Sequence, residues 1–400
     1  MVDDITESIV DNLDNNNNFE NIIKYDNLLK GIYLYGFIKP SKIQLKGINA
    51  INSNNDCIIQ SQSGTGKTAT YLLGIMNKLN TKINNDCQGI IITPTRELTN
   101  QVYNVAINLS KYTNFKINKC IGGTTINKNE LLKSNLIIGT LGRLYHMIND
   151  NQINLDKLKF FVLDEADELL LYGICEKMDE LLKKSLKIKN NDVQNKNVQL
   201  ILISATMSLN VFNVSKKFTF EPIKILLKNN EIVVDLISQF YLDIEIEDQK
   251  LDTLLDLFNL ISTSQAIIFC NTIRKVEWLE EHLNKLNFSI TVIHSNLLQD
   301  ERDSIVKLFR DGETRILLTT DLLSRGIDIP QVNMVINYDL PISKETYIHR
   351  IGRCGRFDKK GVAISLVKTK DQIDIKIFQK LLNFYKLNIV EMPDCIDSFL

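Results

Sequence analysis

Residues 57–68 read CIIQSQSGTGKT, a short apolar run that leads into a glycine-rich loop and then into a helical pattern. A strand, a glycine-rich turn and a helix start form the context that a phosphate-binding loop requires. Gly64 and Gly66 let backbone N–H groups face phosphate oxygens. Lys67 is expected to reach the β- and γ-phosphates, and Thr68 to offer its hydroxyl to Mg²⁺. The alternative, a glycine-rich turn beside an ordinary surface lysine, fits the strand context less well.

The same alternation of apolar runs and helical stretches extends through the rest of the chain. The runs lie at residues 57–59, 89–93, 135–140, 160–163 and 199–203, and again at 266–270, 290–293, 315–318, 334–336 and 361–366. Fully apolar strands that alternate with helices indicate a parallel sheet covered on both faces. The expected fold class is α/β, with two tandem doubly wound parallel-sheet domains joined by a flexible linker.

Composition shifts divide the chain into four segments. Residues 1–18 are acidic and asparagine-rich, which predicts a disordered head. Residues 19–226 are expected to form the nucleotide-binding domain and residues 239–400 the second domain. The polar run Lys228-Asn229-Asn230-Glu231 marks the linker, placed at residues 227–238.

Overall composition excludes several classes of protein. With 400 residues, 44% of them hydrophobic, the chain can bury two ordinary cores. The formal net charge of −1 means that a nucleic acid would have to bind in a local groove. No apolar run approaches the ~18 residues of a membrane span, and the acidic start does not resemble a secretory signal. The seven cysteines are scattered without a C-x-x-C pair, which disfavours a zinc site or a disulfide framework. We therefore expect a soluble intracellular protein.

Asp164-Glu165-Ala166-Asp167 follows the apolar run 160–163. An aspartate at a strand end can hold Mg²⁺ through water, and the neighbouring glutamate can deprotonate an attacking water. The acidic residues could instead cap a helix N-terminus. Because a phosphate-binding loop precedes them in the same expected sheet, the catalytic interpretation is favoured.

Residues 349–356 read HRIGRCGR, in the half of the chain that lacks the phosphate loop. Four ionisable side chains in eight residues could form a solvated basic face, but the glycine spacing and the apolar strand before them disfavour that interpretation. An arginine cluster in a second domain could complete a phosphate site when two domains meet.

Together these motifs resemble the DEAD-box RNA helicases, whose name spells residues 164–167. The resemblance runs from Phe19 to the C-terminus and implies RecA-like domains. Residues 36–44 are similar to the family's adenine-reading motif, which implies that Phe37 stacks on the base and that Gln44 bonds its edge. Without the resemblance, Phe37 would be assigned to the core and Gln44 to a helix surface.

The resemblance also implies a role for each matching residue. For ATP it implies Ser63, Gly64, Thr65, Gly66, Lys67, Thr68, Asp164, Gly326 and Asp328, with Thr68 and Asp164 holding Mg²⁺ partly through water. For catalysis it implies Lys67, the base Glu165 and the arginine fingers Arg353 and Arg356. For RNA it implies Pro94, Thr95, Arg96, Gly122, Gly123, Thr140, Arg143, Gln299, Arg302, Thr320 and Asp321. For coupling between the two domains it implies Asp167, Ser204, Thr206, His349 and Arg350.

The implied activity is RNA-stimulated ATP hydrolysis that drives local, sequence-independent RNA unwinding through domain closure. The match is strongest to members that act in translation initiation, which implies scaffold proteins of that process as partners and a monomer outside its complexes. A cytoplasmic location follows, with a nuclear pool as the open alternative. Two other interpretations stay open: an ATP-locked RNA clamp within an exon-junction-type assembly, and a DNA helicase of the wider superfamily.

Overall fold

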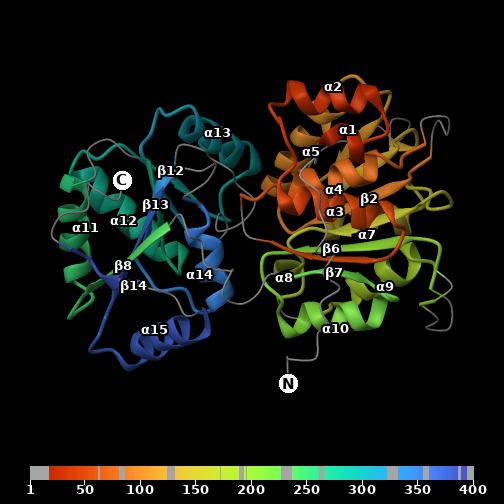
Figure 1. Ribbon diagram of the computed structural model, residues 1–400. Helices are drawn as coiled ribbons and strands as arrows, with labels where there is room; N and C mark the ends of the chain where they lie inside the picture. Colours follow the sequence, from red (N-terminus) through yellow and green to blue (C-terminus); the bar gives the residue numbers. More distant parts are fainter. Residues whose placement is uncertain are drawn as a thin grey trace. The chain divides into compact units, whose positions relative to one another are not determined.

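The computed structural model describes residues 18–61, 64–80, 86–123, 131–171, 173–188, 193–194, 196–226, 237–260, 265–321, 332–354, 360–385 and 389–393. The chain divides into two compact units, one mainly before Lys228 and one mainly from Lys228 onward, and each holds one seven-stranded sheet (Figure 1). The expected head lies outside the described residues apart from Asn18, and so does most of the expected linker. Ile237 and Ser238, which the sequence pattern assigns to the linker, belong to a strand of the second unit.

The first sheet is entirely parallel, as its apolar runs predict. In spatial order its strands are β3 (Ile117–Cys120), β4 (Leu136–Thr140), β2 (Gly89–Thr93), β5 (Phe160–Leu163), β6 (Gln199–Ser204), β1 (Cys57–Gln60) and β7 (Ile223–Ile225). All residues of the central strands β2, β5, β6 and β1 are buried. Parallel pairing brings the carboxyl ends of all seven strands to one edge of the sheet.

Helices cover both faces of this sheet because successive strand residues point to opposite sides. Ile59, Ile91 and Ile201 pack in one core, whereas Ile58 and Ile90 pack in the other. The first face is covered by α1 (Phe19–Ile22), α2 (Asp26–Leu34), α3 (Lys42–Asn52), α4 (Lys67–Met76) and α5 (Arg96–Leu109). The second is covered by α7 (Leu141–Asn149), α8 (Ala166–Leu169), α9 (Glu176–Ser185) and α10 (Leu209–Phe218).

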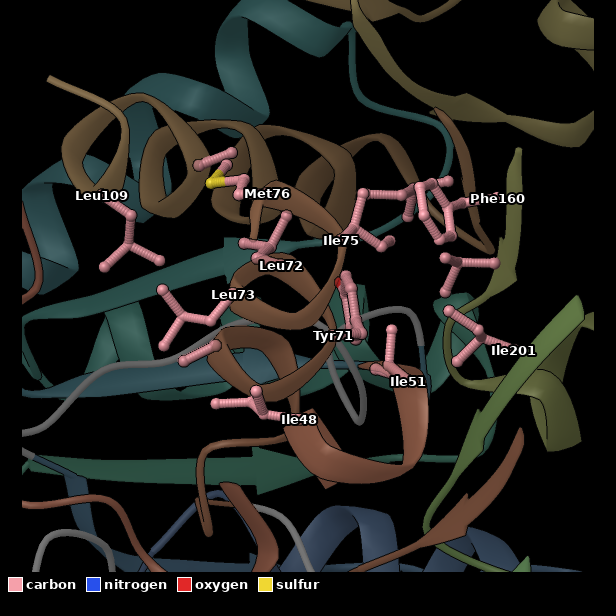
Figure 2. Packing of buried hydrophobic residues seen from close by; sticks show 14 of the residues in the cluster. Ile48, Ile51, Tyr71, Leu72, Leu73, Ile75, Met76, Leu109, Phe160 and Ile201 are labelled. Atoms are coloured by element: carbon pink, nitrogen blue, oxygen red, sulfur yellow. The ribbon is translucent and has the colours of Figure 1, made fainter. Parts of the chain in front are cut away.

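Helix α4 lies deep in the first core. Residues 69–76 are all buried, and Figure 2 shows Tyr71, Leu72 and Ile75 among the side chains of neighbouring elements. Helix α3 packs closely against α4 at Gly47, where a Cβ atom would lie 2.2 Å from Cγ2 of Thr70. The start of α4, which carries the predicted phosphate loop, is therefore held rigidly by the core behind it.

The second sheet is also parallel throughout. Its order is β10 (Ile290–Ile293), β11 (Ile316–Thr319), β9 (Gln265–Phe269), β12 (Val332–Asn337), β13 (Gly361–Val367), β8 (Ile237–Asp243) and β14 (Ile389–Glu391). The helices of this unit are α11 (Gln249–Leu260), α12 (Ile273–Lys285), α13 (Gln299–Arg310), α14 (Lys344–Ile351) and α15 (Gln372–Tyr385). Two doubly wound parallel-sheet units confirm the predicted fold class.

In the described part of the chain, no helix is long and apolar enough to cross a membrane. The six cysteines within the described ranges are free thiols, and all except Cys175 are buried.

Candidate active site

The predicted phosphate loop leaves the carboxyl end of β1 and enters α4 at Lys67. Gly64 and Gly66 have φ angles of 81° and 94°, in a region that other residues rarely adopt. Lys67 Nζ donates a 2.6 Å hydrogen bond to the carbonyl oxygen of Ser61, at the start of the same loop. The ammonium group is therefore held at the loop, where a phosphate would be cradled.

Gln44 is buried against this loop instead of lying on a helix surface. Ser41 caps α3: its Oγ accepts from the Gln44 N–H at 3.3 Å, while Gln44 Oε1 accepts from the Ser41 N–H at 2.8 Å. Ser41 Oγ also lies 3.1 Å from the Thr65 carbonyl oxygen, to which it donates. A Cβ atom on Gly66 would lie 2.6 Å from Gln44 Nε2. The capping box thus brings the expected adenine-reading glutamine into contact with the phosphate loop.

Phe37 lies next to a buried aromatic residue. Its ring centroid is 6.4 Å from that of Phe19, which is fully buried, and 5.1 Å from that of Tyr35. Phe37 itself is half-buried. A partly exposed ring supported from behind by a core ring can stack on a nucleobase.

Asp164 follows β5 and is almost fully buried. Its Oδ2 accepts a 2.7 Å hydrogen bond from the Tyr71 hydroxyl, and its Oδ1 accepts one of 3.0 Å from the Glu165 N–H. Burial and the charge of Glu165 raise the pKa of Asp164 to about 7, against the opposing effects of the Tyr71 hydrogen bond and the Lys67 charge. Asp164 and Lys67 are therefore close enough to influence each other electrostatically.

Glu165 has an unusual backbone conformation for a residue that is not glycine. Its φ and ψ are 47° and 54°, a left-handed geometry that costs about 1–3 kcal/mol and is found often at functional sites. Its Oε2 is buried and has no hydrogen-bond partner within the described ranges. A buried carboxylate oxygen that is not already bonded can accept a hydrogen bond from a water molecule and deprotonate it.

Asp167 is connected to the end of the neighbouring strand β6. Thr206 Oγ1 donates to Asp167 Oδ2 at 2.6 Å, and Ser204 Oγ donates to the Thr206 carbonyl oxygen at 2.7 Å. The structure brings together these three residues, all of which the resemblance implicates in coupling.

The donors at this edge suit Mg²⁺ bound together with a phosphate chain. In the described part of the chain, no group of three or more His, Cys, Asp or Glu side chains could hold a metal. Mg²⁺ commonly uses only one or two carboxylates, with phosphate oxygens and waters as its other ligands. Thr68 and Asp164 can supply a hydroxyl and a carboxylate, and Oε2 of Glu165, which bonds no residue that the structure describes, can bond a water. The predicted residues therefore fit the metal.

The RNA-contact residues predicted for the first unit also lie at the carboxyl edge of the sheet. Thr95 caps α5 by accepting a 3.2 Å hydrogen bond from the Leu98 N–H. Arg96 lies beside the glycine pair after β3: a Cβ atom on Gly122 would be 3.0 Å from Arg96 Nη2, and one on Gly123 would be 3.6 Å from Nη1. A guanidinium beside bare backbone amides can contact a phosphate.

Three further residues belong to the same group. Pro94 follows β2, and Thr140 is the last residue of β4. Arg143 lies in the first turn of α7, and its Nε has no hydrogen-bond partner among the residues that the structure describes.

Strand order separates the two sets of predicted contacts. The predicted RNA-contact residues lie at the ends of β3, β4 and β2, whereas the phosphate loop follows β1, the acidic residues follow β5 and the coupling residues Ser204 and Thr206 lie at the end of β6. The two groups meet between β2 and β5, where the Asp164 N–H bonds the Ile92 carbonyl oxygen at 2.9 Å. One edge of a single sheet therefore presents two adjoining sets of predicted site residues.

In the second unit, Arg350 is fully buried in a polar network. Its Nε donates to Asp321 Oδ1 at 2.6 Å, its Nη1 to the Asp339 carbonyl oxygen at 2.7 Å and its Nη2 to Asn271 Oδ1 at 2.8 Å. The guanidinium carbon also lies 5.2 Å from the centroid of the Phe269 ring. The structure thus joins the expected coupling residue Arg350 to the expected RNA-contact residue Asp321.

Asp339 lies at the centre of this network. Its carboxylate accepts from Lys250, Lys275 and the Asn271 N–H at 2.9–3.1 Å. Burial opposes ionisation of Asp339, but the Lys250 charge, the Asn271 N–H and the Lys275 ammonium together hold its pKa below the usual value for an aspartate. The end of β12 is therefore fixed by ionic contacts.

The other predicted residues of this unit occupy strand ends or helix starts. Gln299 opens α13 and donates to Asp303 Oδ1 at 3.0 Å, Arg302 lies on the next turn, and Thr320 follows β11. Arg353 is buried, and its Nε donates to the His349 carbonyl oxygen at 3.2 Å. Ser63, Gly326, Asp328 and Arg356 lie outside the described residues. The assigned roles in this unit stay predictions.

Several residues that shape the site are not predicted by the sequence pattern. Tyr71 looks like an ordinary core residue of α4, yet its hydroxyl contacts Asp164. Asn271 comes directly after the apolar run 266–270, which is a signal for a residue at a strand end, whereas Asp339 lies three residues beyond the run 334–336.

Comparison with known proteins agrees with this geometry. The DEAD/DEAH box helicase model matches residues 41–214, and the helicase conserved C-terminal domain model matches residues 249–358. The chain is 44% identical to the ATP-dependent RNA helicase eIF4A of Mycosarcoma maydis, over 97% of this chain and 90% of that protein. It is also 44% identical to the ATP-dependent RNA helicase FAL1 of Meyerozyma guilliermondii, over 94% and 92%.

Among solved structures, the chain resembles S. cerevisiae Dbp5 bound to RNA and ADP BeF3. The TM-score is 0.85 at 34% sequence identity, and the alignment covers 94% of this chain and 95% of that one. Both family models, the sequence relatives and the fold therefore agree that the chain belongs to the DEAD-box family of ATP-dependent RNA helicases.

Proposed function

We propose that the chain couples ATP hydrolysis to local unwinding of RNA by closing its two units around ATP and RNA. The observation that carries the proposal is the carboxyl edge of the first sheet. There the phosphate loop and Glu165 lie on strands next to those that carry Arg96 and the glycine pair Gly122–Gly123. It is supported by the similarity to a Dbp5 structure that is bound to RNA and ADP BeF3.

For hydrolysis, each residue of the first unit has a distinct task. Phe37 and Gln44 bind the adenine, and the loop amides with Lys67 bind the phosphates. Thr68 and Asp164 would hold Mg²⁺, which when bound neutralises charge on the β- and γ-phosphates. Glu165 accepts a proton from the attacking water through its buried Oε2.

Arg353 and Arg356 are proposed to stabilise the charge that develops on the γ-phosphoryl group. Residues of this kind commonly contribute ~10³-fold or more to turnover. Because they belong to the second unit, hydrolysis would depend on closure.

RNA is proposed to bind through its backbone. Hydroxyls, arginines and glycine amides contact phosphates and 2′-hydroxyls without reading bases, which favours RNA over DNA without sequence preference. ATP and RNA would each bind both units, so each would raise the affinity for the other by the same factor. Closure would bend one strand of a short duplex and release its partner.

In the cell we propose a role of the eIF4A type in translation initiation, supported by the 44% identity to that protein. Its partners would be scaffold proteins of initiation, and the chain would be a cytoplasmic monomer outside those complexes. The alternative is an ATP-locked RNA clamp in an exon-junction-type assembly. Sustained ATP turnover with RNA alone favours the helicase, whereas a stable ATP-bound complex that requires a partner favours the clamp.

The test compares phosphate release with RNA, with DNA of matched sequence and without nucleic acid. We expect stimulation by RNA alone; equal stimulation by DNA would contradict the RNA-specific mechanism. Glu165→Gln should lower turnover about 10²–10⁴-fold and leave ATP and RNA binding intact. Glu168→Gln, three residues further along in α8, is the matched control and should retain parent activity. Parent-like turnover in the Glu165 variant would show that another group is the base.

A further inference from the structure

Tyr71 is a fully buried tyrosine whose hydroxyl lies beside the predicted catalytic centre. It stands one helical turn after Lys67 on α4, among Ile48, Ile51 and Leu72 of the first core (Figure 2). Its hydroxyl donates a 2.7 Å hydrogen bond to Asp164 Oδ2. The rest of the ring is enclosed by apolar side chains, so packing fixes the position of the hydroxyl.

The hydrogen bond determines how the Asp164 carboxylate is oriented. Oδ1 accepts from the Glu165 N–H at 3.0 Å, and Oδ2 accepts from Tyr71, so each oxygen has one fixed donor. A carboxylate oxygen can accept a second interaction, which leaves each oxygen a lone pair for a water or a metal. Without the phenol, Oδ2 would lose its donor and the carboxylate could rotate about its Cβ–Cγ bond.

The Tyr71 hydroxyl keeps the proton that this hydrogen bond requires. Burial, followed by the neighbouring Asp164, raises the pKa of Tyr71 well above its usual value. The phenol therefore stays the donor to Asp164 Oδ2.

We propose that Tyr71 is a positioning residue, which fixes the Asp164 carboxylate in the orientation that Mg²⁺–nucleotide requires. Partners of metal-binding groups commonly affect metal affinity about 10–100-fold. The inference rests on the proposed magnesium site and extends it to a residue that touches neither metal nor nucleotide.

The test is Tyr71→Phe, which removes one oxygen atom and keeps the ring that fills the core. The full chain is titrated with a fluorescent ADP derivative in EDTA and then at increasing Mg²⁺ concentrations. We expect an unchanged ADP affinity in EDTA, and about a 10-fold or greater rise in the Mg²⁺ concentration that half-maximally tightens ADP binding.

Tyr347→Phe is the matched control, because Tyr347 is also fully buried and donates a 3.0 Å hydrogen bond to Gln239 Oε1 in the second unit. This variant should titrate like the parent. A Tyr71→Phe protein with parent Mg²⁺ dependence, or with an equal loss of affinity in EDTA, overturns the positioning role. A parent protein whose ADP affinity is insensitive to Mg²⁺ overturns the magnesium site itself.

Discussion

Replacing Lys196 by methionine should destabilise the first unit far more than the loss of an ordinary ion pair. Lys196 Nζ lies 2.7 Å from Asp56 Oδ2, and the two side chains are only 5% and 4% exposed. Asp56 also accepts from the N–H groups of Leu200 and Phe220, each at 2.8 Å. One carboxylate thus connects the start of β1 to β6 and to the turn before β7.

The magnitude follows from what the substitution leaves behind. Burial lowers the pKa of Lys196 by more than the charge of Asp56 raises it, so the net shift is downward. Desolvation therefore outweighs the attraction to Asp56 for this cation. Lys196→Met leaves a buried carboxylate without its counter-charge, which typically costs about 3–5 kcal/mol. Adding Asp56→Asn removes that charge, so the double variant should lose clearly less than the sum of the two single losses.

Urea unfolding measures the effect one unit at a time. Far-UV circular dichroism follows both units, whereas the single tryptophan, Trp278, reports only on the second. With a slope of about 3 kcal/mol/M, the dichroism transition of the first unit should move down by about 1 M or more, and the fluorescence transition should not move.

The control is Lys183→Met, whose ion pair with Asp179 on α9 is 2.7 Å long but 43% exposed at the lysine. Exposed pairs contribute about 0–1 kcal/mol, so its transition should barely move. Equal shifts for Lys196→Met and Lys183→Met would refute the argument that the buried carboxylate dominates.

Three other variants test separate parts of the structure. Gly66→Ala introduces a Cβ atom 2.6 Å from Gln44 Nε2 at a φ of 94°, a strain of about 1–3 kcal/mol, so fluorescent ADP should bind about 10-fold more weakly; parent affinity would contradict the contact. Leu72→Ala should lower the free energy of unfolding of the first unit by about 2–5 kcal/mol, seen as an earlier dichroism transition, and leave the tryptophan fluorescence transition unmoved. Asp339 has a lowered pKa, so its ionised form stabilises the folded second unit. This stabilisation is present above pH ~4 and is lost as the pH falls through the pKa of Asp339 in the folded state. Lys275→Met should therefore shift acid unfolding of the second unit to higher pH, and an unmoved fluorescence midpoint would exclude that contribution.

The interior of the fold can be predicted from sequence because buried strands are apolar on both faces. All ten apolar runs, such as residues 89–93 and 160–163, form strands. The pattern does not predict β3, β7, β8 or β14. Of these, β3, β7 and β14 lie at sheet edges, where partial exposure allows polar residues such as Lys119 and Lys224. Edge strands therefore lack the continuous apolar signal.

The site is only partly predictable for a different reason. Glycine spacing before Lys67 marks the loop locally, but the position of Gln44 depends on the packing of α3 against it. The Tyr71–Asp164 contact joins residues 93 positions apart, and it requires the order of the strands, which local pattern does not specify. Contacts between residues on different strands can thus be identified only from the tertiary structure.

The division of the first sheet's edge has a consequence for engineering. The predicted RNA contacts of the first unit lie at the ends of β2, β3 and β4, and the segments after β3 and β4 are separated by β2 from the hydrolytic residues after β5 and β1. Exchanging the segments after β3 and β4 should change which polymer is bound, or how tightly, without replacing the hydrolytic residues after β5 and β1. Because the proposed mechanism links ATP and RNA binding, the stimulation of hydrolysis by the polymer should change with it. Substrate preference can therefore change in evolution while the hydrolytic residues keep their positions in the sheet.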